Sequence, residues 1–117
     1  MLKKNYKQSL GKHGENLAKK YYQSLGYKII KQNYWTRYGE LDLVCQKNKA
    51  VLIVEVKTRR GQKFGYGEEI INQKKIDNLI QAYQLLQNEL ELPNYYEIEI
   101  CVIELKNNQK TLKRFLI

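Results

Sequence analysis

Two neighbouring segments of the chain combine apolar strand residues with charged side chains at alternate positions. Because side chains alternate between the two faces of a strand, Glu40 and Asp42 share one face, and Glu55 shares a face with Lys57. The opposite faces hold Leu41 and Leu43 in the first segment, and Leu52, Val54 and Val56 in the second. Charged side chains are rarely buried unless they are paired or bind a metal. Four of them on two short apolar strands therefore predict a functional site.

The composition is typical of one soluble globular domain. A chain of 117 residues with 43% hydrophobic and 28% charged residues is long enough to bury a core. It contains no apolar run of the roughly 20 residues needed to cross a bilayer, and no secretory signal. Cys45 and Cys101 are best explained as buried free thiols in a reducing compartment. We therefore expect a single domain over residues 1–117, in the cytoplasm and not in a membrane.

Positive charge is concentrated in the first two thirds of the chain. Residues 1–75 hold 17 of the 21 Lys and Arg residues but only 6 of the 12 Asp and Glu residues. Such an excess favours a polyanionic partner, although a basic protein without such a partner explains the charge about equally well. The only histidine, His13, provides no zinc-ligand cluster, and we assign it no role.

Hydrophobic periodicity and turn residues predict the order α-β-β-β-α-β-β. Helices are expected at 9–25 and 68–90, and strands at 27–35, 39–46, 50–57, 96–105 and 111–116. Ser9 is the expected cap of the first helix, and a glycine-rich loop is expected over residues 58–67. Trp35 is assigned to the core, as most aromatic strand residues are.

Several short motifs occur in an order that resembles a known family. Asp42, followed on the next strand by Glu55-x-Lys57, is similar to the PD-(D/E)XK nuclease superfamily. The wider set resembles the YraN-like family of bacterial nuclease-like proteins: residues 14–18 (Gly-Glu-Asn-Leu-Ala), 25–27 (Leu-Gly-Tyr), 33–34 (Asn-Tyr), 39–43 and 54–59 (Val-Glu-Val-Lys-Thr-Arg). The layout is also similar to archaeal Holliday-junction resolvases, with Glu15 as their first-helix glutamate. The resemblance covers about residues 10–83. It departs at Leu41, where the superfamily has proline, and at Glu97, where a basic residue is expected.

The resemblance implies a fold and an activity. The fold is a restriction-endonuclease-like three-layer α/β core, in which helices flank a mixed sheet. The activity is endonucleolytic hydrolysis of phosphodiester bonds in DNA, with branched or single-stranded structures as candidate substrates. Carboxylate oxygens suit Mg²⁺ or Mn²⁺, so Asp42 and Glu55 are the expected metal ligands, with Glu15 and Glu40 as further candidates. Lys57 is the expected residue for orienting water or stabilising the phosphate charge.

Basic side chains near the predicted site are candidates for nucleic-acid contact: Arg37, Arg59, Arg60, Lys63, Lys74 and Lys75. Simpler interpretations remain open: a solvated loop for these residues, an ion pair for Glu55 with Lys57, and a solvated helix residue for Glu15. At the level of the whole chain, the alternatives are a nucleic-acid-binding module that keeps the nuclease fold without cutting, and a protein-interaction domain. Whether the chain forms a homodimer also stays open.

Overall fold

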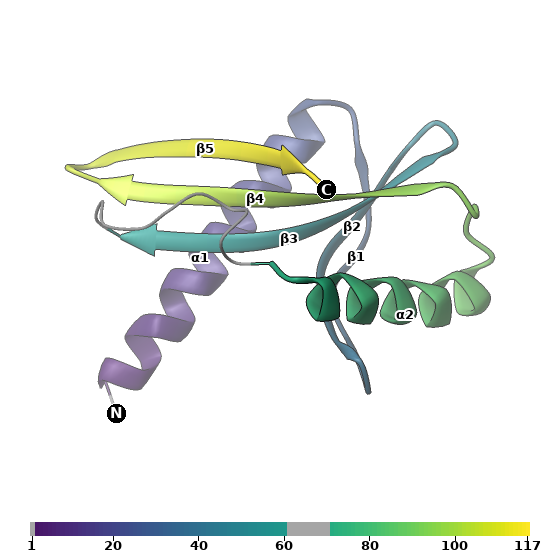
Figure 1. Ribbon diagram of the computed structural model, residues 1–117. Helices are drawn as coiled ribbons and strands as arrows, with labels where there is room; N and C mark the ends of the chain where they lie inside the picture. Colours follow the sequence, from purple (N-terminus) through teal and green to yellow (C-terminus); the bar gives the residue numbers. More distant parts are fainter. Residues whose placement is uncertain (1, 61–70) are drawn as a thin grey trace.

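The computed structural model describes residues 2–60 and 71–117, with side chains from residue 9 onward. It contains two helices and five strands (Figure 1): α1 (Leu2–Ser24), β1 (Lys28–Thr36), β2 (Gly39–Lys47), β3 (Ala50–Arg60), α2 (Gln73–Leu90), β4 (Tyr96–Lys106) and β5 (Gln109–Leu116). The predicted order of elements is confirmed over the described residues. The mixed α/β class is confirmed as well.

The five strands form one open sheet in the order β1-β2-β3-β4-β5. Neighbouring strands are antiparallel except for β3 and β4, which are parallel. A parallel pair requires a long crossover connection, and α2 lies within it. Short turns join the other strands. The β4–β5 turn is a type I′ hairpin, because Asn107 and Asn108 both have positive φ angles, 51° and 62°.

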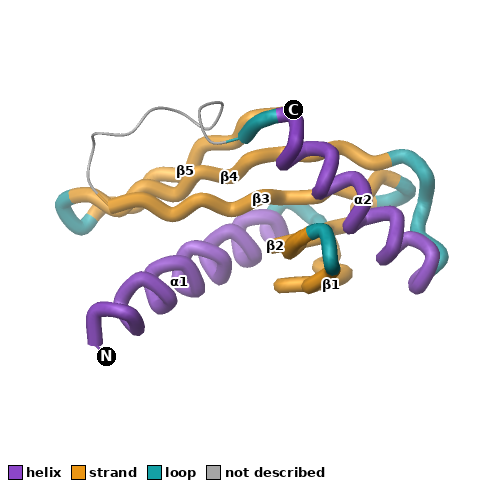
Figure 2. The backbone as a smooth tube through the Cα atoms, turned by 60° about the horizontal axis from the view of Figure 1, so that its bottom comes forward, coloured by secondary structure: helices purple, strands orange, loops and turns teal. Residues whose placement is uncertain are grey.

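The two helices cover opposite faces of this sheet (Figure 2), and β3 shows why. Its alternate side chains Leu52, Val54 and Val56 pack with Ala18 and Tyr22 of α1. The intervening Val51 and Ile53 pack with residues of α2 that recur at helical spacing, namely Leu79, Ala82, Tyr83 and Leu86. A strand that is apolar on both faces needs cover on both, so the continuous apolar sequence of β3 places it at the centre of the three layers.

The three largest differences between the predicted and the observed boundaries are at α1, β3 and α2. Helix α1 begins at Leu2 rather than Ser9, because residues 2–8 contain good helix formers and no glycine or proline. Strand β3 continues to Arg60, because Thr58, Arg59 and Arg60 pair with β4. Helix α2 begins at Gln73 rather than residue 68, and the Asn72 side chain caps it by accepting from the Lys75 backbone N–H at 2.8 Å. The rest of the predicted loop, and Lys63 within it, lie outside the described residues.

Candidate metal centre

The site begins where β2 and β3 separate. Their ladder ends at the pair Leu43–Val54, although β1 continues to pair with β2 as far as Gly39. Beyond the last pair, the Val56 backbone N–H donates to Asp42 Oδ2 at 2.8 Å. The Asp42 carboxylate thus replaces a strand backbone acceptor and lies in the opening between the two strands, where it is 8% exposed.

Strand alternation breaks at the same place. Leu43 packs with α1, but Leu41 packs on the α2 face, so the expectation that these two leucines share a face was wrong. Opposite them, in β1, Asn33 has the left-handed φ of 54°, a conformation that asparagine tolerates better than most residues. The distortion shows that faces cannot be assigned by counting along β2 through the site.

Three carboxylates meet at this distortion, from two elements. One ligand oxygen each from Glu15 of α1 and Glu40 and Asp42 of β2 lie within 4.8 Å of one another. The Asn33 amide holds two of them, since its Nδ2 donates to Glu15 Oε1 and to Glu40 Oε2, both at 2.8 Å. Opposite ligands of an octahedral Mg²⁺ are about 4.2 Å apart. Small side-chain movements therefore bring these oxygens to coordination distance of a single ion.

Burial and mutual repulsion disfavour the ionised form of these carboxyl groups. Burial, followed by the charge of Glu55, raises the pKa of Asp42 to about 8, against the opposing effect of the Val56 hydrogen bond. Burial also raises the pKa of Glu15, with further contributions from Glu40 and Glu55, while the Asn33 hydrogen bond lowers it. Groups with raised pKa values next to one another are typical of sites that bind a cation or perform acid–base chemistry.

Glu55 lies beside this group, on the side where two lysines approach. Its Oε2 is 3.2 Å from Lys75 Nζ and 3.9 Å from Lys57 Nζ. Its Oε1 is buried and accepts no hydrogen bond from the described residues. A buried carboxylate oxygen without a partner costs about 1–3 kcal/mol or more. A divalent cation would satisfy this oxygen, so the donor set fits Mg²⁺ or Mn²⁺ in chemistry and in charge.

The carboxylates that the structure brings together differ from the pair expected from the sequence. Glu40, which was only a further candidate, belongs to the group of three, whereas Glu55, an expected ligand, lies adjacent to that group. Asn33 and Lys75 have roles in the site that the sequence did not indicate. Asn33 belongs to the Asn-Tyr motif at residues 33–34, and asparagine is disfavoured inside strands, but neither signal specified its contacts with Glu15 and Glu40. Lys75 was named only as a contact for nucleic acid.

The other basic candidates differ in exposure and in position. Lys74, next to Lys75 at the start of α2, is exposed, and so is Arg60 at the end of β3. Arg59 is half-buried on the same strand. Arg37, in the β1–β2 turn, lies over the Tyr38 ring, 5.0 Å from its centroid, and donates to Tyr38 Oη at 3.1 Å.

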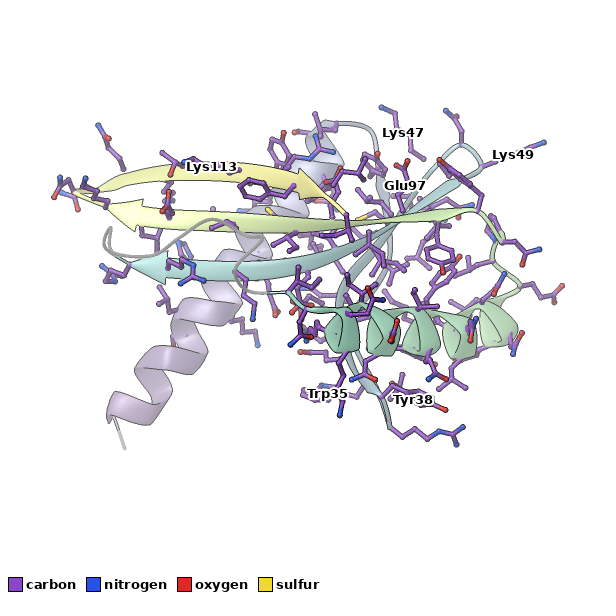
Figure 3. All side chains as sticks on the ribbon, viewed as in Figure 1. Trp35, Tyr38, Lys47, Lys49, Glu97 and Lys113 are labelled. Atoms are coloured by element: carbon purple, nitrogen blue, oxygen red, sulfur yellow. The ribbon has the colours of Figure 1, made fainter. Side chains whose placement is uncertain are left out.

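Trp35 is not a core residue, which corrects the expectation from the sequence. Its side chain is 73% exposed. The neighbouring Tyr34 packs on the α2 face, so Trp35 faces the other side near the end of an edge strand. Its register partner on β2 is Glu40, and residues directly opposite on antiparallel strands share a face. Figure 3 shows Trp35 and Tyr38 projecting from the lower end of the sheet.

No helix among the described residues is both long and apolar enough to cross a membrane.

Comparison with known proteins identifies the family. A family model described as "Uncharacterised protein family UPF0102" matches residues 14–105. A UPF0102 protein of Syntrophomonas wolfei is 53% identical over 73 residues, 62% of this chain and 64% of that protein. UPF0102 proteins of Sulfurihydrogenibium sp. (39% over 101 residues) and Vibrio parahaemolyticus (31% over 106) match 85% and 91% of this chain, and 85% and 88% of their own lengths. The YraN-like resemblance is thereby confirmed, and the chain belongs to the UPF0102 family.

Proposed function

We propose that this protein is a Mg²⁺- or Mn²⁺-dependent endonuclease that hydrolyses phosphodiester bonds in DNA. The observation that carries the proposal is the meeting of Glu15, Glu40 and Asp42 within 4.8 Å, beside a buried Glu55 that has one unpartnered oxygen. Carboxylates in that number, in a basic chain, suit a cation that in turn holds a phosphate.

The residues divide into those that hold the cation and those that face the substrate. Asp42, Glu15 and Glu40 are the proposed ligands, and Glu55 joins them through its unpartnered oxygen. A bound divalent ion supplies Lewis-acid polarisation of the phosphate and lowers the pKa of a coordinated water. Lys57 and Lys75 place their ammonium groups beside Glu55, where they stabilise negative charge that develops on the phosphate.

The architecture supports the same proposal at the level of the fold. A mixed sheet between two helices, with the carboxylates at the point where two central strands separate, suits the restriction-endonuclease-like core that we propose for this chain. The net charge of +9 suits a polyanionic substrate. The exposed Trp35 beside Glu40 favours DNA with unpaired bases over an uninterrupted duplex, because an aromatic ring needs a free base on which to stack.

Cleavage is the test. Purified protein is incubated with linear, single-stranded, flapped and four-way DNA in Mn²⁺, Mg²⁺ or EDTA. We expect metal-dependent cutting of at least one unpaired or branched substrate, and loss of cutting of at least about 100-fold in Asp42→Asn. Glu97→Gln is the matched control, because it removes an exposed carboxylate that accepts a hydrogen bond from the Tyr95 hydroxyl and is not part of the carboxylate group. Equal activity of both variants would reject the assignment.

One observation favours a non-catalytic nucleic-acid-binding module as the second candidate. The Lys75 ammonium lies 3.2 Å from Glu55 Oε2, as it would in an inert ion pair. Lys57→Ala separates the two functions, because transition-state interactions change the rate without an equal change in ground-state binding. An enzyme loses cutting by about 100-fold or more in this variant while its DNA affinity stays within about threefold. If the wild-type protein binds DNA and cuts no substrate in the panel, the second candidate is supported.

A further inference from the structure

A second feature of the surface lies away from the carboxylates, between α1 and the β4–β5 hairpin. It is a hollow of about 280 Å³. Its lining includes one histidine, three cationic side chains and the two asparagines of the turn: His13, Arg60, Lys106, Lys110, Asn107 and Asn108. None of the described residues that line it is acidic. The three elements that meet there are far apart in the sequence, so no sequence motif marks the hollow.

We propose that this hollow binds a phosphate group of the same nucleic-acid strand that the carboxylate site acts on. This inference rests on the proposed function for the identity of the polymer. Lysine and arginine bind phosphate by charge and by donated hydrogen bonds, and the amides of the turn and the imidazole of His13 add further hydrogen-bond donors. The volume is near the lower end of small-molecule pockets, roughly 300–1,000 Å³, which suits a phosphodiester group better than a large ligand.

The position of the hollow relative to the carboxylates suits a polymer. Strand β3 carries both Glu55 and Arg60, and five residues of strand span about 16 Å. Successive phosphates of one strand rise about 3.4 Å along the axis of B-form DNA, and an unpaired strand can extend further per nucleotide. A strand that lies along β3 therefore has a phosphate at the hollow within about five nucleotides of the one at the carboxylates. All but one of the lining side chains are exposed, so a chain can enter and leave.

The single histidine of the sequence makes the hollow directly observable. Imidazole resonances in an NMR spectrum report on His13 alone. The protein is titrated in EDTA with a 20-nucleotide single strand, so that no divalent ion takes part. We expect the His13 resonances to shift and to saturate with the affinity measured independently by fluorescence anisotropy.

A charge-removal pair tests the same site through affinity. Lys106→Gln with Lys110→Gln should weaken binding of the oligonucleotide about tenfold at low salt and flatten the slope of log affinity against log salt by about 0.7–1.4. The control is Lys28→Gln with Lys49→Gln, which removes equal charge near the β2–β3 turn, at the other end of the sheet (Figure 3). Equal weakening by both pairs would show a diffuse charge effect and would overturn the proposal.

Further results would overturn the proposal or separate it from the proposed function. His13 resonances that stay in place while the oligonucleotide binds would overturn the proposal. A shift with inorganic pyrophosphate but none with the oligonucleotide would assign the hollow to free phosphates and overturn it as well. We expect the Mn²⁺ affinity measured by calorimetry to be unchanged in Lys106→Gln with Lys110→Gln, because the hollow and the carboxylate site are distinct. A protein whose His13 responds to DNA but which neither binds Mn²⁺ nor cuts would retain this inference and lose the proposed function.

Discussion

Asp42 has both a structural contact and a proposed chemical role in the site. It accepts the Val56 N–H where the ladder between β2 and β3 has ended, and it is one of three carboxylates within 4.8 Å. Burial and the neighbouring acids raise its pKa to about 8, far above the ordinary value near 3.9. Between about pH 4 and pH 8, therefore, Asp42 holds a proton in the folded protein but has lost it in the unfolded chain.

The pH dependence of stability follows from that difference. The free energy of unfolding falls as pH rises wherever the folded state holds more protons, so in EDTA the wild-type protein should lose stability between pH 5 and pH 8. Asp42→Asn keeps an acceptor for Val56 and removes the buried charge, so at pH 8 it should exceed the wild type by roughly 1–3 kcal/mol. Urea denaturation at several pH values measures this. A wild-type stability that stays level or rises across this range, relative to Asp42→Asn, would contradict the account.

Trp35 gives a prediction about the substrate. Stacking of a base on an aromatic side chain contributes about 1–3 kcal/mol, so Trp35→Ala should weaken binding of single-stranded DNA by about 5- to 150-fold and alter duplex binding little. Tyr95, which is 61% exposed, provides the control variant Tyr95→Ala. Because Trp35 is the only tryptophan, quenching of its fluorescence reports the contact in the wild type. An equal effect of the two variants would remove Trp35 from the binding surface.

At the scale of elements, the position of Glu15 depends on how closely α1 approaches β3. A Cβ atom added at Gly14 would lie 1.7 Å from Thr58 Oγ1 and 2.8 Å from Thr58 Cβ. Gly14→Ala should therefore displace the helix, lower stability by about 1–3 kcal/mol and weaken Mn²⁺ binding. Gly11→Ala is the matched control, since nothing lies within 4 Å of its added Cβ, and it should be neutral or stabilising by up to about 1 kcal/mol. Thermal denaturation and calorimetry compare the two variants, and similar losses in both would show that contact with Thr58 does not position α1.

The elements themselves were predictable because their signals are local. Apolar periodicity marked both helices and all five strands in order, and short motifs marked the family. The extension of β3 to Arg60 depends on pairing with β4, which lies more than forty residues away, so no local pattern signals it. Leu41 and Leu43 pack on opposite faces where the β2–β3 ladder ends and where Asn33 has a left-handed φ. Strict alternation cannot anticipate such a distortion, and no local pattern signals the exposure of Trp35.

At the scale of the whole molecule, charge and architecture support each other. The helices cover the two apolar faces of the sheet and leave the separated strands β2 and β3 to present carboxylates that a compact core would otherwise exclude. The cationic side chains beside Glu55 and those of the hollow at the β4–β5 turn lie at two places along β3. We propose that one polyanion contacts both places, with the divalent cation at the carboxylate site.

The central claim is that the carboxylates bind a divalent cation, and an anomalous difference map from crystals grown in Mn²⁺ tests it most directly. The account predicts one strong peak within coordination distance of Asp42 and of at least two of Glu15, Glu40 and Glu55. It also predicts that the peak is absent from Asp42→Asn crystals and present in Glu97→Gln crystals. Wild-type crystals without a peak at these carboxylates, with Lys75 still paired to Glu55, would contradict the account.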